Sequence, residues 1–152
     1  MTEPFLSMKM RGLDELVRVL KEMPDKTRAK ISRQALRQSA ELMKQEVIAR
    51  TPRKDGFLQA SIRTKIQVGV NFERALIIAG DARAWYAHLM EYGFVHTGHG
   101  KKKKERKPTS RGKVEGKAFL RGAAEAKFEP TVDLFEKTVG EVIEKEASKL
   151  KG

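Results

Sequence analysis

The sequence predicts an α+β domain in which a small antiparallel sheet packs against a long helix and a C-terminal helix. Three patterns support this fold class. Helix-forming residues run without a break from residue 26 to 50, two alternating segments follow at 62–79, and apolar residues at helical spacing return after residue 118. Helices and strands in separate runs, rather than in strict alternation, are typical of an α+β fold. The length of 152 residues suits a single domain, 1–152.

The N-terminal part is predicted to hold two helices. Residues 5–10 alternate weakly, as in a strand, and apolar residues at helical spacing then indicate a short amphipathic helix over 13–23. Asp25 is expected to cap the second helix, and Thr51-Pro52 is expected to end it. The apolar stripe of this second helix is narrow, which suits a helix lying across one face of a sheet.

The middle of the chain predicts a hairpin followed by an aromatic segment. Residues 62–68 alternate as a half-buried strand does, a turn is expected at 71–74, and residues 75–79 form a more apolar second strand. Residues 85–92 are predicted to form a short helix near the sheet. Trp85 and the adjacent Tyr86 are expected to be core anchors.

Most of the positive charge lies in one segment. Residues 94–117 hold nine basic and two acidic residues, which gives +7 of the net charge of +12. Their glycines and Pro108 predict a flexible loop inserted into the domain. This loop is expected to contact DNA or an acidic partner. The candidate contact residues are Lys101, Lys102, Lys103, Lys104, Arg106, Lys107, Arg111 and Lys113.

A last helix is expected to follow the apolar stretch 118–128. Its buried face is marked by Phe135, Val139, Val142 and Ile143. Pro130 fits the first turn of this helix or a kink in it. Residues 145–152 are charged and are expected to fray.

Several kinds of site are not indicated by the sequence. The absence of cysteine excludes disulfides and thiolate chemistry, and neither a secretory signal nor a membrane-spanning run is evident. His96 and His99 have the spacing of a metal pair, but the glycines around them disfavour a helix and no third ligand is near. His88 is expected to be packed or interfacial. With no nucleophile or phosphate-binding motif, no cofactor and no enzymatic activity are expected, and a hydrolase with an unrecognised site is the least favoured reading.

Several segments together resemble a known family. They are Gly12–Leu16, Thr51–Ile62, Tyr86–Gly93 and Lys117–Arg121. In order and spacing they resemble the tail-component family of long-tailed bacteriophages, the tail-completion or head–tail joining proteins. The resemblance extends over nearly all of the chain except 94–117. At two positions the chain departs from the pattern, because Ala118 and Gly122 stand where the family usually or often has proline.

The resemblance implies a structural virion protein of the neck or tail top. Such a protein is expected to form a ring with copies of itself, hexameric in the family pattern, around the passage for DNA. Its other expected partners are a tail-tube or tail-terminator protein and the head connector, with assembly in the host cytoplasm and no membrane contact. The candidate subunit-interface residues are Glu91, Tyr92, Phe119 and Arg121.

Two questions stay open at the level of sequence: the environment of Glu91 and the function of the basic arm. Arg121 can pair with Glu91 across the sheet or across a subunit boundary, or Glu91 can be a solvated charge at a helix end. The alternative function is a nucleic-acid-binding protein that uses the basic arm 101–113. Lysine dominates this arm, which has no aromatic residue and only two arginines, so it favours phosphate contacts over sequence recognition.

Overall fold

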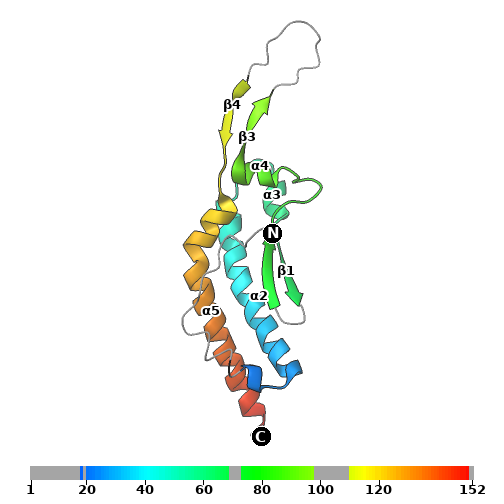
Figure 1. Ribbon diagram of the computed structural model, residues 1–152, viewed down its shortest axis with the longest axis vertical. Helices are drawn as coiled ribbons and strands as arrows, with labels where there is room; N and C mark the ends of the chain where they lie inside the picture. The colour runs from blue at the N-terminus through cyan, green and yellow to red at the C-terminus, as the bar shows by residue number, and fades with distance from the viewer. Residues whose placement is uncertain (1–17, 19, 69–72, 98–109, 151–152) are drawn as a thin grey trace.

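Two long antiparallel helices form the spine of the molecule (Figure 1). The computed structural model describes residues 18, 20–68, 73–97 and 110–150. Helix α2 spans Asp25–Arg50 and helix α5 spans Phe119–Leu150. In Figure 1 they run side by side in opposite directions, and the β1–β2 hairpin lies on the side of α2 away from α5. The predicted α+β class, with a long helix and a C-terminal helix on a small antiparallel sheet, is confirmed.

The lower part of the spine has its own apolar core. Ile31 and Ala35 of α2 and Val139 of α5 are fully buried there, and Val142 is nearly so. Phe135 and Ile143 are half-buried against this cluster, so the predicted inner face of the last helix is confirmed. Leu20 adds to the cluster. Residues 20–22 are helical, which agrees with the short helix predicted at 13–23, whose earlier part, like the strand predicted at 5–10, lies outside the described residues.

Helix α2 begins at Asp25, one residue earlier than predicted. The carbonyl of Pro24 already accepts helical hydrogen bonds from the amides of Thr27 and Arg28, both at 3.0 Å. Pro24 therefore stands at the N-cap position, and the prediction of Asp25 as the cap is wrong. Asp25 instead lies in the first turn, where its carboxylate is 2.7 Å from Arg28 Nη2. The helix ends before Thr51, as predicted.

The predicted hairpin is confirmed. Strands β1 (Arg63–Val68) and β2 (Glu73–Ile78) pair antiparallel, with Thr64 opposite Ile77 and Ile66 opposite Ala75. Both strands pack against α2. The second strand starts before its predicted position, so Glu73 and Arg74 belong to the strand rather than to the turn, and residues 69–72 lie outside the described part.

A second core joins the hairpin to the upper end of the spine. Two short helices contribute to it: α3 (Phe57–Ala60), which the sequence did not suggest, and α4 (Ala87–Tyr92), which it did. The buried members of this core come from α2, α3, α4, α5 and the segments between them. They are Val47, Leu58, Ile62, Ala84, Ala87, Phe119 and Ala123.

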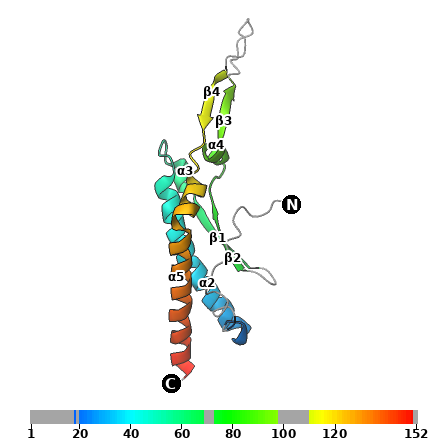
Figure 2. The same cartoon turned by 60° about the vertical axis from the view of Figure 1, so that its left-hand side comes forward.

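The ends of the predicted loop 94–117 are not irregular. Strand β3 (Gly93–Thr97) pairs antiparallel with strand β4 (Ser110–Glu115), and the ribbon extends away from the rest of the molecule (Figures 1 and 2). The prediction of a loop throughout 94–117 is therefore wrong at both ends. Gly112 does not break β4, because a glycine tolerates its φ of 90° and the register shifts between Val95 and Thr97. Residues 98–109, which connect the strands, lie outside the described part.

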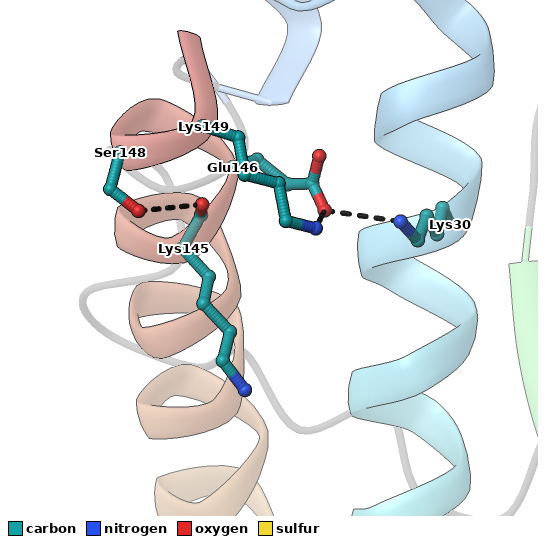
Figure 3. Close-up of polar contacts among 5 residues, drawn as sticks. All are labelled: Lys30, Lys145, Glu146, Ser148 and Lys149. Atoms are coloured by element: carbon teal, nitrogen blue, oxygen red, sulfur yellow. Dashed lines mark hydrogen bonds and ion pairs between the residues drawn. The ribbon is translucent and has the colours of Figure 1, made fainter. Parts of the chain in front are cut away.

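Helix α5 is one element from Phe119 to Leu150. Pro130 lies inside it rather than in its first turn. Residues 145–150 are helical where fraying was expected at 145–152, and residues 151–152 lie outside the described part. Glu146 is held from two sides in these last turns. Figure 3 shows the Glu146 carboxylate between Lys30 of α2, at 3.1 Å, and Lys149, at 3.0 Å. No helix among the described residues is long and apolar enough to cross a membrane.

Candidate assembly surface

The ribbon, α4 and α5 meet at a buried carboxylate. Glu91 lies near the end of α4 and is only 6% exposed. Its Oε2 accepts a hydrogen bond from the amide of Leu120 at 2.9 Å, and its Oε1 accepts one from the amide of Arg121 at 3.1 Å. The first amides of a helix have no partner inside the helix and carry the positive end of its dipole. Glu91 therefore caps the N-terminus of α5 from a distant part of the chain.

The reading of Glu91 as a solvated charge is wrong, and no ion pair with Arg121 forms within the chain, whereas pairing across a subunit boundary stays a prediction. Glu91 is not solvated, because its carboxylate is buried. Arg121 does meet it, but through the backbone amide. The guanidinium of Arg121 lies over the ring of Tyr92 instead, 5.9 Å from the ring centroid. The segments that hold Glu91 and Arg121 are therefore in contact, as the sequence suggested, but the contact is not an ion pair.

The base of the ribbon is a close backbone crossing. A Cβ atom on Gly93 would lie 2.5 Å from the carbonyl oxygen of Val114, and one on Gly116 would collide with the carbonyl oxygen of Glu91. Glycine is required at both positions because no side chain fits between the two chains. The amide of Lys117 then donates to the carbonyl oxygen of Met90 at 2.7 Å. The exit of the ribbon is thus fixed against α4 by backbone contacts.

Ala118 makes the turn from the ribbon into α5. Its amide donates to the carbonyl oxygen of Glu91 at 3.2 Å, and its φ is 45°. Proline is restricted to φ near −65° and has no amide hydrogen, so it cannot adopt this conformation. Alanine at position 118 is therefore compatible with this turn, whereas proline is not.

An exposed aromatic face runs along α4. Trp85, His88 and Tyr92, spaced three and four residues apart, share one side of the helix and its entry, and we call them the aromatic face. Trp85 is 65% exposed and Tyr92 is 71% exposed. The ring of His88 lies against the entry, with Nδ1 3.1 Å from the carbonyl oxygen of Trp85. Large exposed aromatic side chains of this kind are typical of the centres of protein interfaces.

Two sequence predictions about this segment need correction. Trp85 is not a core anchor, since its ring is mostly in solvent and meets Tyr86 edge-on at 6.1 Å between centroids. Tyr86 is packed against the upper core, as predicted. His88 is exposed rather than packed, so only its predicted interfacial role remains open.

The loop before the aromatic face is held by Asp81. Its Oδ1 accepts hydrogen bonds from the amides of Ala84 and Arg83, both at 2.8 Å. These two bonds stabilise the charged carboxylate and lower the pKa of Asp81 below its ordinary value. A fixed loop places Arg83 near Phe57, with the guanidinium carbon 6.0 Å from the ring centroid. Phe57 is itself 46% exposed and extends the apolar surface toward α3.

The other predicted site residues have mixed outcomes. Phe119 is 1% exposed and belongs to the upper core, which leaves little of its side chain for a neighbour, and its place in a subunit interface stays a prediction. Tyr92 and Arg121 are exposed and remain candidates. Lys113 is exposed on β4, and Arg111 lies in the same strand. Lys101 to Lys104, Arg106, Lys107 and His99 lie outside the described part of the chain. Among the described residues, no three His, Cys, Asp or Glu side chains group as metal ligands would.

The surface around α4 has the composition of a protein-binding surface. It combines exposed Trp, Tyr and Phe side chains with Arg83 and Arg121, and it adjoins a projecting ribbon on which Val95 and Val114 are also exposed, at 57% and 38%. Residues of these types supply most of the binding energy at protein interfaces. The class is that of a scaffold or assembly module.

Comparison with known families identifies the family. Residues 14–93, just over half of the chain, match the family described as "Bacteriophage HK97-gp10, putative tail-component". The chain belongs to this family and is a structural component of a phage tail, which places it among other virion proteins. The match ends at Gly93, so the ribbon, α5 and the resemblance seen at Lys117–Arg121 lie beyond it. No curated protein and no solved structure matched the chain.

Proposed function

We propose that this tail component is a ring subunit at the head-proximal end of the tail, where it completes the tail and joins it to the head. The ring is hexameric, as the sequence resemblance implies, and DNA passes through its centre. The protein acts by binding and carries out no catalysis. Its neighbours are copies of itself, the tail-tube or tail-terminator protein below and the head connector above.

The observation that carries this proposal is the fixed junction at Glu91. It holds two contact elements, the aromatic face and the β3–β4 ribbon, at one end of a long helical spine. A joining protein must contact two different neighbours and keep them at a set distance. A rigid spine with contact surfaces concentrated at one end meets this requirement, since the other end remains available for a second neighbour.

The ribbon also favours contact with DNA as part of the joining role. Its two strands are connected by residues 98–109, which hold six basic residues and one acidic residue, a net charge of +5. Lysine-rich segments neutralise phosphates without reading bases. We therefore assign the connecting segment to the DNA passage or to an acidic face of the next ring, and the function as a free nucleic-acid binder becomes the second candidate.

A phage that lacks this gene product tests the joining role. We expect lysates with DNA-filled heads and separate tails of normal length, and we expect purified wild-type protein to join them in vitro. Electron microscopy of the lysate measures the ratio of joined to separate particles. Intact virions without the protein, or lysates that contain heads but no tails at all, would show that joining is not its role.

The second candidate predicts a different result in the same system. A free nucleic-acid binder would shift DNA in a salt-dependent manner while tails and virions assembled normally without it. Retention of wild-type and 98–109-deleted protein on immobilised DNA, measured beside the joining assay, separates the two functions.

A further inference from the structure

The β1–β2 hairpin has one face on α2 and one face that no described helix or strand covers. Ile77 of β2 packs toward the upper core, so residues that alternate with it point the other way. Three of these are exposed cations: Arg63 and Lys65 of β1 and Arg74 of β2. We call them the basic face. Arg74 Nε is held by Gln67 Oε1 at 2.8 Å, and the Arg63 guanidinium donates to the carbonyl oxygen of Gly80 at 3.0 Å.

The basic face also contains apolar surface. Leu76 lies opposite Lys65 and Ile78 lies opposite Arg63 in the strand register, and both aliphatic side chains are only half-buried. Isolated two-stranded sheets are marginally stable in water. A sheet with cations around a small aliphatic centre has the composition of an interface whose partner is acidic.

Helix α5, which lies on the other side of α2 from the hairpin in Figure 1, carries a stripe of carboxylates. They are spaced by four, four and three residues, which places them on one stripe of the helix surface. This acidic stripe consists of Glu125, Glu129, Asp133 and Glu136. The first three are exposed and Glu136 is half-buried. The stripe contrasts with the net charge of +12 of the whole chain. Its side chains take part in none of the ion pairs found among the described residues.

The two surfaces lie on different layers. Figures 1 and 2 both show α2 beside α5 and the hairpin on α2, and only α2 packs extensively against both. A surface on the hairpin and a surface on α5 cannot meet within one chain in this arrangement. They can meet between chains, and contact between two different surfaces of identical chains generates a ring when the rotation closes.

We propose that the basic face of one subunit packs against the acidic stripe of the next subunit, so that a second copy of this chain occupies the hairpin face that no described helix or strand covers. The proposal rests on the ring of the proposed function and adds the surfaces that build it. Each subunit then contributes its hairpin to one neighbour and its α5 helix to the other. The charges set the direction and the register of this contact, and Leu76 with Ile78 supplies its apolar centre.

Charge reversal tests the contact at side chains that lie at the surface. Arg63 also donates to the carbonyl oxygens of Gly80 and Ser61, so Lys65→Glu alone is measured beside the double variant as the change that breaks neither bond. One variant carries Arg63→Glu with Lys65→Glu, a second carries Glu129→Lys with Asp133→Lys, and a third carries all four changes. We expect ring formation to weaken by about tenfold or more in each of the first two, because like charges then face each other. We expect the third to form rings again, because the attraction is restored with its sign exchanged.

A matched control changes the same amount of charge elsewhere. Glu22→Lys with Asp55→Lys adds the same positive charge as the second variant at exposed positions off the stripe, and it should leave ring formation unchanged. Light scattering and electron microscopy of the full-length protein, alone and on isolated tails, give the assembly state. Circular dichroism confirms that each variant is folded.

The outcomes separate the surfaces from the function. The proposed contact would be overturned if rings still formed in both double variants, or if the fourfold variant stayed dissociated. Neither result would contradict the ring itself. A large fall in the melting temperature of the free monomer on Lys65→Glu alone would also overturn the proposed contact, since the hairpin face would then be covered by the chain itself. Wild-type protein that forms no ring, alone or on tails, would instead remove the ring from the proposed function.

Discussion

At the scale of single residues, the Glu91 carboxylate performs a task that is usually local. Helix N-caps come mostly from the residue just before the helix, whereas Glu91 lies 29 residues from Leu120, whose amide it binds. The sequence placed Glu91 and Arg121 in contact but could not show which groups touch. Side-chain charge favoured an ion pair. The carboxylate instead accepts hydrogen bonds from the first amides of α5, whose need for a partner no side-chain pattern reveals.

Removing the Glu91 carboxylate should destabilise the fold. We expect Glu91→Ala to lower the free energy of unfolding by about 3 kcal/mol, because two charge-assisted hydrogen bonds are lost and two amides near the core lose their partner. Glu91→Gln retains one good acceptor and should cost about 1 kcal/mol. Chemical denaturation followed by circular dichroism measures both changes.

The matched control for Glu91 is its supposed ion-pair partner. Arg121→Ala should cost only about 0.5 kcal/mol, since its guanidinium meets the exposed ring of Tyr92 and leaves the cap untouched. Equal losses in Arg121→Ala and Glu91→Ala would contradict the assignment of Glu91 as a backbone cap.

Two substitutions of Ala118 test the turn into α5, because they should change the free energy of unfolding in opposite directions. Ala118→Gly should raise the free energy of unfolding by about 0.5 kcal/mol, because glycine relieves the strain at φ 45° and loses part of that gain in the unfolded chain. Ala118→Pro should lower it by about 3 kcal/mol or more, because proline cannot take this φ or donate to Glu91. Thermal unfolding measures both, and a tolerated proline would show that the turn has another conformation.

Trp85 separates stability from assembly. Its ring is 65% exposed, so Trp85→Ala should change the free energy of unfolding by no more than about 1 kcal/mol. If the aromatic face binds a neighbour, the same change should weaken that contact by about 2 kcal/mol, or about 30-fold. The yield of joined particles measures the contact. Val68→Ala, at another exposed apolar residue, is the control and should retain full joining.

At the scale of elements, the long helices, α4 and the first hairpin were predictable, whereas α3 and the ribbon were not. Helix α2 and the inner face of α5 follow apolar residues at helical spacing, and β1–β2 follows alternation. Strand β4 has the sequence Ser-Arg-Gly-Lys-Val-Glu, in which charge and glycine hide any strand pattern. It forms because backbone pairing with β3, closed by two glycines at the base, does not depend on side-chain pattern.

The lower end of the spine should respond to acid through Glu146. Hydrogen bonds from Lys149 and then Lys30 lower the pKa of this carboxyl below its ordinary value of 4.5. A lowered folded-state pKa stabilises the fold above about pH 4.5, and this stabilisation is lost as the pH falls through the folded-state value.

Glu146→Gln tests this coupling. The variant should melt slightly below wild type at neutral pH, and the difference should shrink as the pH falls below 4.5. Melting temperatures of both proteins across this range measure the effect, which high salt should also reduce because the ion pair is exposed to solvent. A difference that stays constant with pH would mean that charge at Glu146 does not hold α5 to α2.

At the scale of the whole molecule, the described part of the chain divides into a body and a projection. The body holds both apolar cores, and the ribbon adds no buried apolar residue to either. The family match ends where the ribbon begins, at Gly93. The concentration of positive charge in residues 94–117 distinguished this segment from the rest of the sequence. Charge alone did not predict that its two ends form an antiparallel ribbon.

Shortening the ribbon should therefore spare the fold. We expect replacement of residues 98–109 by a two-residue Asn-Gly turn to keep the melting temperature within a few degrees of wild type, because neither core is touched. Joining of heads to tails should fall sharply, and retention on immobilised DNA should weaken and depend less steeply on salt. An unfolded product would show that the segment is part of the body.

The crossing of Gly93 and Gly116 also has a mechanical consequence. Backbone packed against backbone leaves little room for hinge motion, and the amide of Lys117 and the Glu91 cap tie the same point to α4 and α5. A sideways load at the far end of the ribbon is therefore transmitted to the helical spine as torque instead of being absorbed at the base. We therefore expect the ribbon to act as a lever arm rather than as a tether, so that a displacement at its far end turns the helical spine to which its base is fixed.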